Sequence, residues 1–390
     1  MRSNIRLLYL IPWQTDFAVS LVIFAVSRGM AEADKNLFQL GVMGAIFSLT
    51  MAGSSLVCGR LSDRFAPRIL IAWGSFVLMT VPLLAGARYD RLSHAMLGIA
   101  SGMIYPAVVV WLTQGRGVGP GRGNMNRVLM WFGLSWNLGV MAGQLGGGWL
   151  FGMNRHWPLT GAFVLSVANL CVMAAMCRHA RPFNPDQIFP MGEQLHHRSL
   201  AAAYVRLAWI ANLGGTFSMS MVFFLLPKLV VVMDVPSEEH GVIVATMRAI
   251  VIVVYVVMYR LKFWHFRFMT NLVSQTIAVA GLLILSMAHS TLMLWIGLIG
   301  LAQLSGFNYF ASLYYSSSGS AEEKRGSASG IHEATLALGL AVGSFVGGLS
   351  GHLIGDRAPY VLAAAVVAIL ALVQLVLYLQ QTRGRIRAAG

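Results

Sequence analysis

The sequence predicts an all-α polytopic membrane protein with twelve transmembrane helices in two pseudo-symmetric six-helix bundles. Three observations carry this prediction: the composition, a series of apolar segments of spanning length, and a repeat at an offset of 200 residues. Of the 390 residues, 57% are hydrophobic and only 11% are charged, whereas soluble domains carry about 25% charged residues. Such a small number of charges cannot cover a water-facing surface of this size, so most of the surface is expected to face lipid.

The apolar segments predict the individual helices, because a spanning helix needs roughly 20 mainly apolar residues. A signal peptide is not expected at the N-terminus, since Pro12, Gln14 and Asp16 interrupt the first apolar run and no small-residue cleavage site follows. We therefore predict a retained first helix. The longest polar connection, 178–204, is expected to be a cytoplasmic linker between an N-terminal bundle (1–177) and a C-terminal bundle (205–390). The predicted helices span 7–28, 37–59, 69–87, 93–113, 127–151, 158–177, 206–230, 239–259, 268–288, 291–314, 328–350 and 360–380.

The basic charge is explained by topology. The formal net charge is +14, which in a soluble protein would suggest nucleic-acid binding. With the N-terminus placed inside, 20 of the 28 Lys and Arg residues fall in cytoplasmic segments, seven in outer loops, and Arg248 within a helix. This distribution follows the positive-inside rule. It predicts an integral protein of the inner (plasma) membrane with both termini cytoplasmic, in contact with anionic membrane lipids and without a nucleic-acid partner.

The repeat is most visible in a strip of glycines spaced by four residues. Gly41 and Ser20 also recur in the same register, as Gly241 and Ser220. A single strip is typical of close helix packing in membranes, but two strips in one register indicate duplication. Parallel duplicated halves are typical of transporters with a site at the membrane midplane. The glycines are Gly139, Gly143 and Gly147 in the fifth predicted helix and Gly339, Gly343 and Gly347 in the eleventh.

The segment Gly59-Arg60-Leu61-Ser62-Asp63-Arg64-Phe65-Ala66-Pro67-Arg68 follows the second predicted helix. It resembles the signature loop of the major facilitator superfamily, Gly-x-Leu-x-Asp-Arg-x-Gly-Arg-Arg, and departs from it at Ala66 and Pro67. The glycines of the fifth helix resemble the antiporter motif of that family, with Gln144 in place of proline. The family's arginine in the fourth helix is missing, and the loop after the eighth helix does not repeat the signature.

The resemblance implies a carrier that works by alternating access, with helices one, four, seven and ten lining a central cavity. For the signature loop it suggests a conformational latch formed by Gly59, Asp63, Arg64 and Arg68. Asp63 would lie near the N-terminus of the eleventh helix, where a carboxylate is favoured by roughly 0.3–1 kcal/mol. The alternative is that these arginines only follow the positive-inside rule.

Three ionisable residues lie within predicted helices: Asp16, Arg248 and Glu333. Such residues are costly in a membrane and are functional candidates by default. We predict that these three, with His332, take part in substrate binding or proton coupling. Arg248 could bind an anionic group, or it could form a purely structural ion pair with Glu333 or Asp16. Glu333 could carry a proton, or it could cap its helix or pair with Arg325.

Polar residues at helical spacing predict the rest of the cavity. Those in the first and seventh helices lie three or four residues apart, on one helix face. The positions 16 and 20 correspond to 216 and 220 in the repeat. The predicted lining is Trp13, Ser20, Tyr105, Asn212, Thr216, Ser220 and Asn308.

Together these features predict a secondary active transporter of a small organic solute, coupled to protons, with a lean towards export. Uptake coupled to protons or to another solute is the alternative, and a receptor or scaffold without transport is the alternative class. An enzyme is not expected, because only His332 and Glu333 form a dense pair of catalytic residue types. No phosphate-cradling Gly-x-x-x-x-Gly-Lys-Ser/Thr loop is present, which argues against direct ATP use. We expect a monomer with no cofactor and no metal site.

Overall fold

The computed structural model describes residues 7–113, 125–177, 195–261, 263–319 and 325–389. Within these residues the chain is all-helical and forms twelve long helices, when α8, η1 and α9 are taken as one continuous helix. The all-α prediction is therefore confirmed. The elements are α2 (Leu10–Glu32), α3 (Leu37–Ser62), α4 (Pro67–Gly86), α5 (Asp90–Thr113), α6 (Met125–Met153), α7 (Trp157–Cys177), α8 (Leu195–Ser220), η1 (Met221–Leu225), α9 (Leu226–Val232), α10 (Ser237–Arg260), α11 (Phe268–Ser286), α12 (Thr291–Gly319), α13 (Arg325–Ile354) and α14 (Ala358–Ala389).

Several helix boundaries differ from the sequence prediction by a few residues or more, and two of the differences concern Arg28 and the linker. The first helix continues to Glu32, so Arg28, expected in an outer loop, lies inside α2 and is buried. It remains within the helix because its guanidinium finds hydrogen-bond acceptors there, as described below. The helix α8 begins at Leu195, inside the range expected for the linker, and residues 178–194 of that linker lie outside the described residues.

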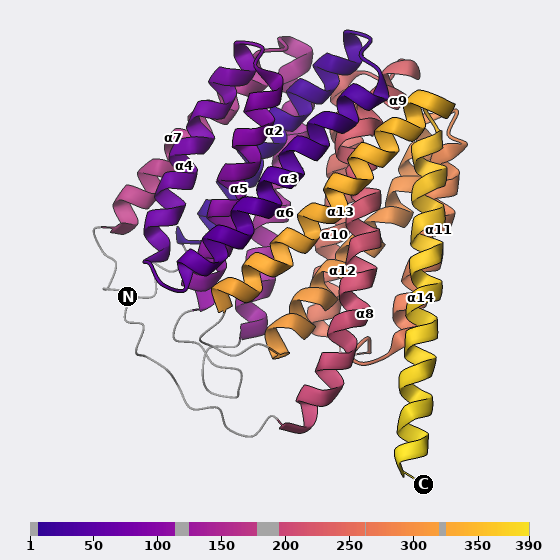
Figure 1. Cartoon of the computed structure of the whole chain (residues 1–390). Coiled ribbons are helices and arrows are strands. Elements are labelled where there is room, and N and C mark those ends of the chain that lie inside the picture. Colours follow the sequence, from indigo (N-terminus) through magenta and orange to yellow (C-terminus); the bar gives the residue numbers. More distant parts are fainter. Residues whose placement is uncertain (1–6, 114–124, 178–194, 262, 320–324, 390) are drawn as a thin grey trace.

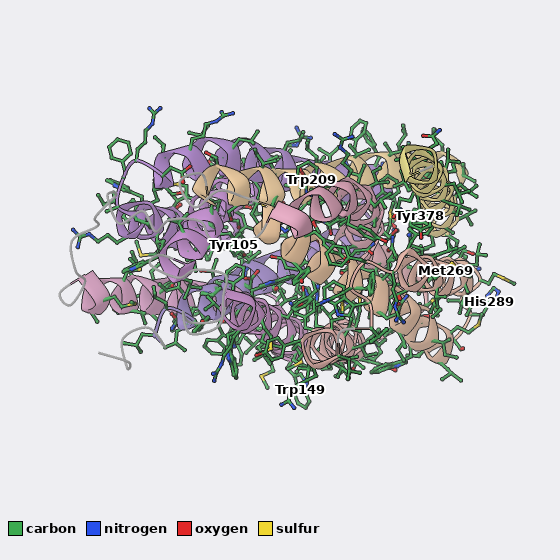
Figure 2. The ribbon with its side chains drawn as sticks, turned by 90° about the horizontal axis from the view of Figure 1, so that it is seen from below. Tyr105, Trp149, Trp209, Met269, His289 and Tyr378 are labelled. Atoms are coloured by element: carbon green, nitrogen blue, oxygen red, sulfur yellow. The ribbon has the colours of Figure 1, made fainter. Side chains whose placement is uncertain are left out.

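The exterior of the bundle is apolar. Large hydrophobic side chains such as Trp73, Leu83, Met269 and Leu372 are more than half exposed. In Figure 2, the labelled Trp149 and Met269 project from the periphery, whereas Tyr105 lies among the helices. Eleven helices of the described residues are long and apolar enough to cross a membrane; α6 is long enough, but it carries many glycines and polar side chains. The chain is an integral membrane protein.

The two halves of the chain repeat the same local structure. Asp34 and Asp234 both end a helix with positive φ, of 53° and 55°. In each case the next residue donates its N–H five residues back, from Lys35 to Met30 O at 3.0 Å and from Val235 to Val230 O at 2.9 Å. This is the hydrogen-bond pattern of a Schellman helix end.

The glycine strips pack within each half in matching register. Gly143 faces Ser20 on α2, and Gly343 faces Ser220 on α8. The same pairing holds at Gly139 with Asp16 and at Gly339 with Thr216. Because glycine has no side chain, α6 and α13 can approach the neighbouring helix closely at these positions.

Two seams join the halves, one between α3 and α13 and one between α6 and α10. Figure 1 shows α3 and α13 side by side between the indigo-to-magenta helices and the rose-to-yellow helices. At one end of the molecule Gly41 meets Gly348 and Gly148 meets Gly241. We call this end the Asp34 end. At the other, the Asp63 end, Gly59 meets Gly330.

One break in the symmetry lies in the long helix formed by α8, η1 and α9. Residues Met221–Leu225 form a π-helical turn just before Pro227. Proline lacks an N–H and its ring collides with the carbonyl four residues earlier, here that of Phe223. The equivalent position in α2 is Ser27, and α2 has no such interruption. Pro227 therefore accounts for a π-turn that is present here and absent at the equivalent place in α2.

Candidate functional site

A cavity of about 140 Å³ lies between the halves and is lined by residues from both. It contains all three ionisable residues that the sequence singled out: Asp16 from α2, Arg248 from α10 and Glu333 from α13. Among the predicted lining residues, Ser20, Tyr105, Asn212 and Thr216 also face it. The remaining lining is mostly aromatic and aliphatic: Val19, Ile23, Phe47, Met51, Phe132, Trp136, Val140, Gly215, Met219, Phe223, Phe224, Ser305, Tyr309, Leu336 and Leu340.

Asp16 is held in place by Tyr105. The Tyr105 hydroxyl, from α5, donates to Asp16 Oδ1 at 2.7 Å. Asp16 Oδ2 is buried and has no hydrogen-bond partner in the described part of the chain. One carboxyl oxygen is therefore fixed, and the other is open to a proton or a ligand.

Arg248 lies in the middle of α10 and is only 2% exposed. Its guanidinium sits over the rings of Phe223 and Trp136, with 4.7 and 5.6 Å between Cζ and the ring centroids. Nη1 lies 3.4 Å from Asn137 Oδ1, and Nε has no acceptor among the described residues. The sequence allowed a structural ion pair between Arg248 and Asp16 or Glu333. No salt bridge joins Arg248 to either residue in the described ranges.

Glu333 is 5% exposed and faces the cavity from the third turn of α13. Its neighbour His332 is buried but is not part of the cavity lining. His332 instead lies edge-on to Tyr309, with 5.4 Å between ring centroids, and its Nδ1 is 3.4 Å from Ser312 Oγ. Successive residues of a helix point about 100° apart, and here this difference turns His332 towards Tyr309 and Ser312 of α12. Arg325, the alternative partner of Glu333, has a side chain outside the described set.

Three predicted lining residues lie elsewhere. Trp13 packs edge-on against Phe17, with 5.6 Å between ring centroids. Ser220 is turned towards Gly343 and donates to a carbonyl of its own helix. Asn308 donates to Ala211 O at 2.7 Å and lines a separate, smaller cavity. Each was placed by helical spacing, which fixes a face of the helix but not the neighbour that face meets.

Sequence reasoning missed the surroundings of Arg248. Trp136, Asn137 and Phe223 contact it, and Tyr309 lines the same cavity. A signal existed for Asn137 alone, since an amide inside an apolar helix needs a buried partner. The aromatic residues gave none, because such residues are frequent on lipid-facing and packing surfaces alike.

The signature loop contacts the N-terminus of α13. Asp63 Oδ1 accepts a hydrogen bond from Gly326 N at 2.8 Å, and Oδ2 accepts from Ser327 N at 2.9 Å and Ser327 Oγ at 2.7 Å. The carboxylate therefore satisfies N–H groups that a helix start leaves without partners. Gly59 packs against the same helix, Arg64 is exposed and Arg68 is half-buried.

A second inter-half junction lies at the Asp34 end. Arg28 pairs with Glu32 at 2.7 Å and donates through Nη2 to Val235 O at 3.0 Å, across the halves. Lys228 pairs with Asp34 at 2.5 Å. The Lys228 hydrogen bond and charge lower the pKa of Asp34 below its usual value. Sequence reasoning did not identify this junction, because its partners lie about 200 residues apart.

Comparison with curated proteins finds one distant relative to report, the tetracycline resistance protein, class C, of Escherichia coli. It is 26% identical over 237 residues, which cover 55% of this chain and 57% of that protein. The matched part thus spans little more than half of the relative's length.

Solved structures match over nearly the whole chain. The human organic anion transporter MFSD10 (TETRAN) superimposes with a TM-score of 0.72 at 14% identity, covering 96% of this chain and 99% of that one. A bacterial homolog of the human lysosomal transporter Spinster, in an inward-facing and occupied conformation, gives 0.72 at 15% identity, with 97% of each chain covered. At these identities the likeness shows the fold.

The family model described as Major Facilitator Superfamily matches residues 8–332. That range covers most of the chain, and the fold comparisons agree with it. The resemblance seen in the signature loop is thereby confirmed, as is the expectation of a carrier with no enzymatic activity. The chain belongs to the major facilitator superfamily and is a secondary transporter.

Proposed function

We propose that the protein couples the movement of a small organic solute to protons and works as an exporter. The observation that supports this is the pair of buried carboxyl side chains, Asp16 and Glu333, which reach one cavity from opposite halves. Ionisable residues inside a membrane are functional candidates by default. In carriers built from duplicated halves, the coupling site lies between the halves.

The environment of Asp16 suits reversible protonation. A proton on Oδ2 would remove a buried charge while Oδ1 kept its hydrogen bond from Tyr105. Burying a charge without a partner is costly, and neutralising it is the usual escape. When the cavity opens to water, the ionised carboxylate becomes acceptable again. Asp16 is thus the first candidate for proton carriage, with Glu333 as the second.

The export direction is supported by the glycines of α6, which resemble the antiporter motif, and by the relative named a tetracycline resistance protein. Uptake with protons is the alternative direction. Tetracycline is therefore one solute to test, beside small organic acids, amines and neutral compounds.

For orientation, we propose that the Asp63 end faces the cytoplasm of a cell with this protein in its inner membrane. The 20-to-seven distribution of Lys and Arg supports this. Both termini would then be cytoplasmic. The exposed Arg64 at this end is suited to contact anionic lipid headgroups.

Purified protein in liposomes loaded with a pH-sensitive dye tests the coupling. An acidic lumen is imposed and solutes are added one at a time outside. We expect a solute that enters the lumen in exchange for protons to dissipate the gradient with wild-type protein. Asp16→Asn or Glu333→Gln is expected to abolish that dissipation while solute binding, measured separately, persists.

The competing readings give different results. Solute that accumulates with an inward proton gradient, and not against it, would indicate uptake. Solute movement that ignores the pH gradient in wild-type and both variants would sink the proton coupling. Binding without movement under any gradient would favour a receptor.

A further inference from the structure

Arg248 differs from the other two ionisable residues of the cavity, because Asp16 and Glu333 can be neutralised by a proton and a guanidinium stays charged. It is 2% exposed, and in the described ranges no carboxylate forms a salt bridge with it. Its direct contacts among the described residues are two aromatic faces and one amide oxygen, Asn137 Oδ1 at 3.4 Å, and Tyr255 and Asp16 lie within electrostatic range. Its Nε has no acceptor in the part of the chain that the structure describes.

These neighbours do not compensate for burial of the charge. A guanidinium stays protonated in proteins, so it cannot escape burial by becoming neutral as a carboxyl group can. Cation–π contacts offset only part of the penalty for removing an ion from water, and the hydrogen bond to Asn137 is long. The site is therefore short of negative charge at Arg248.

The two carboxyl groups in the cavity do not fill this role. Asp16 accepts a hydrogen bond from the Tyr105 hydroxyl through one oxygen, and it acts on Arg248 from a distance without a salt bridge among the described residues. Glu333 comes from α13 and forms no salt bridge among the described residues. If both are protonated the cavity carries one positive charge, and its other walls are mainly apolar. A ligand complementary to such a site has one anionic group and an apolar body.

We propose that the cavity binds a small organic monoanion, whose carboxylate or sulfonate group sits on the Arg248 guanidinium and whose flat apolar body lies among the aromatic side chains around it. The fork of the guanidinium matches two oxygens of such a group. Phe223 and Trp136 both pack against the guanidinium. This assignment of a substrate class rests on the proposed transport function.

Size limits the ligand further. The cavity volume of about 140 Å³ lies below the 300–1,000 Å³ typical of drug-sized ligands. In this conformation the site suits a molecule with one or two rings. The asymmetry of the repeat agrees with one anion per transporter, because the position equivalent to Arg248 is the buried Ser48.

A charge series of equal shape tests the proposal: benzoate, benzamide and benzylamine, and the same three groups on naphthalene. Binding to purified protein at fixed pH, without a gradient, is followed by thermal stabilisation and calorimetry. We expect the carboxylates to bind and the matched amides and amines not to bind. Carboxylate affinity should fall on the order of thirtyfold or more in Arg248→Gln, because one partner of a buried charge pair is lost.

Two further variants separate the causes. Arg248→Lys keeps the charge without the fork and should retain part of the carboxylate affinity. Arg206→Gln changes an exposed arginine of α8 and should bind as wild type does. If Arg248→Gln does not fold, the charge series on wild type and Arg248→Lys still decides.

Three results would overturn the assignment: amides or amines that bind as well as carboxylates, carboxylate binding unchanged in Arg248→Gln, or no carboxylate of either size bound. Failure of the coupling is distinguishable from these. Carboxylate binding without proton movement in liposomes would refute the coupling and leave the substrate class. Proton-coupled movement of an amine would refute the substrate class and leave the coupling.

Discussion

The contact between Asp63 and the start of α13 predicts that removal of one carboxylate will open the Asp63 end. The carboxylate accepts three hydrogen bonds, from Gly326 N, Ser327 N and Ser327 Oγ, at 2.8, 2.9 and 2.7 Å. It belongs to one half and its donors to the other. These bonds exist only while the two halves meet at this end, so their loss destabilises that state alone.

The magnitude follows from the role of Asp63 as a helix cap supplied by another helix. Replacing a capping Asp by Ala costs about 0.5–2 kcal/mol, and the helix dipole adds up to about 1 kcal/mol. Asp63 is half-exposed, so water can replace part of the loss. We expect Asp63→Ala to shift the equilibrium by about 1–2 kcal/mol, roughly five- to thirtyfold, towards states open at this end.

Distances between spin labels in a cysteine-free background measure this shift. Phe65 and Ile331 are exposed, lie on opposite halves and flank the Asp63 end, while Lys35 and Ile354 do the same at the Asp34 end. In Asp63→Ala the long-distance fraction should grow for the first pair and shrink for the second.

Two further variants test whether the hydrogen bonds of Asp63, and not the charge of the loop, cause this shift. Ser327→Ala removes one of the three bonds and should give a smaller shift, whereas Arg64→Gln changes an exposed side chain of the same loop. Equal distance distributions in wild type and Asp63→Ala would refute the latch, and an Arg64→Gln shift as large as that of Asp63→Ala would show that loop charge matters instead.

Three further changes have definite expected outcomes. Gly41→Ala should slow transport and lower thermal stability, since its methyl carbon would lie 2.9 Å from backbone of α13, whereas Gly53→Ala on the same helix meets nothing within 4 Å and should be neutral. Lys228→Met should loosen the Asp34 end, because it removes the ion pair with Asp34. Since the folded-state pKa of Asp34 is lowered, the pair stabilises this end above the ordinary pKa of Asp34, and that stabilisation is lost as pH falls through the lowered value. Spin-label distances of wild type and variant should therefore converge at acidic pH and at high salt. Pro227→Ala should restore a regular helix before it and weaken carboxylate binding, measured by calorimetry, because the π-turn carries one of the rings over Arg248.

The fold could be predicted because its causes are visible one segment at a time. Apolar runs of spanning length give the helices, and the glycine strips give the repeat. The neighbourhood of Asp63 also followed from sequence, since helix direction alone brings the end of α3 to the start of α13. These arguments need only the span and direction of each helix, not its rotation about its own axis.

The site could be predicted only in part, because it depends on rotation and on local irregularity. Asp16, Arg248 and Glu333 were identified by the cost of charge in lipid, and all three line the cavity. His332 was placed with them although it points away. The ring of Phe223 lies over Arg248 on a π-turn, and no periodic pattern announces such a turn.

The two halves share their packing but not their chemistry, and this difference has a physical reason. Rocking of one half against the other needs close, smooth seams on both sides, so Gly41 and Gly241 recur and face Gly348 and Gly148. The charge of Arg248, which we propose binds the ligand, has no such reason to recur in both halves. A second arginine at the position of Ser48, which is fully buried, would add another ion with the same desolvation cost.

The proposed latch at Asp63 is likewise present in one half and not repeated at the equivalent position of the other. Asp63 caps α13, whereas the equivalent residue of the other half is Phe263, which is 46% exposed. A carboxylate at only one of two seams stabilises the closed state of the Asp63 end by one set of bonds instead of two. That leaves a smaller barrier to opening, within reach of the binding energy of a small ligand. Duplication supplies the shared packing of the two seams, and in our proposal single-copy residues determine the ligand and the balance of states.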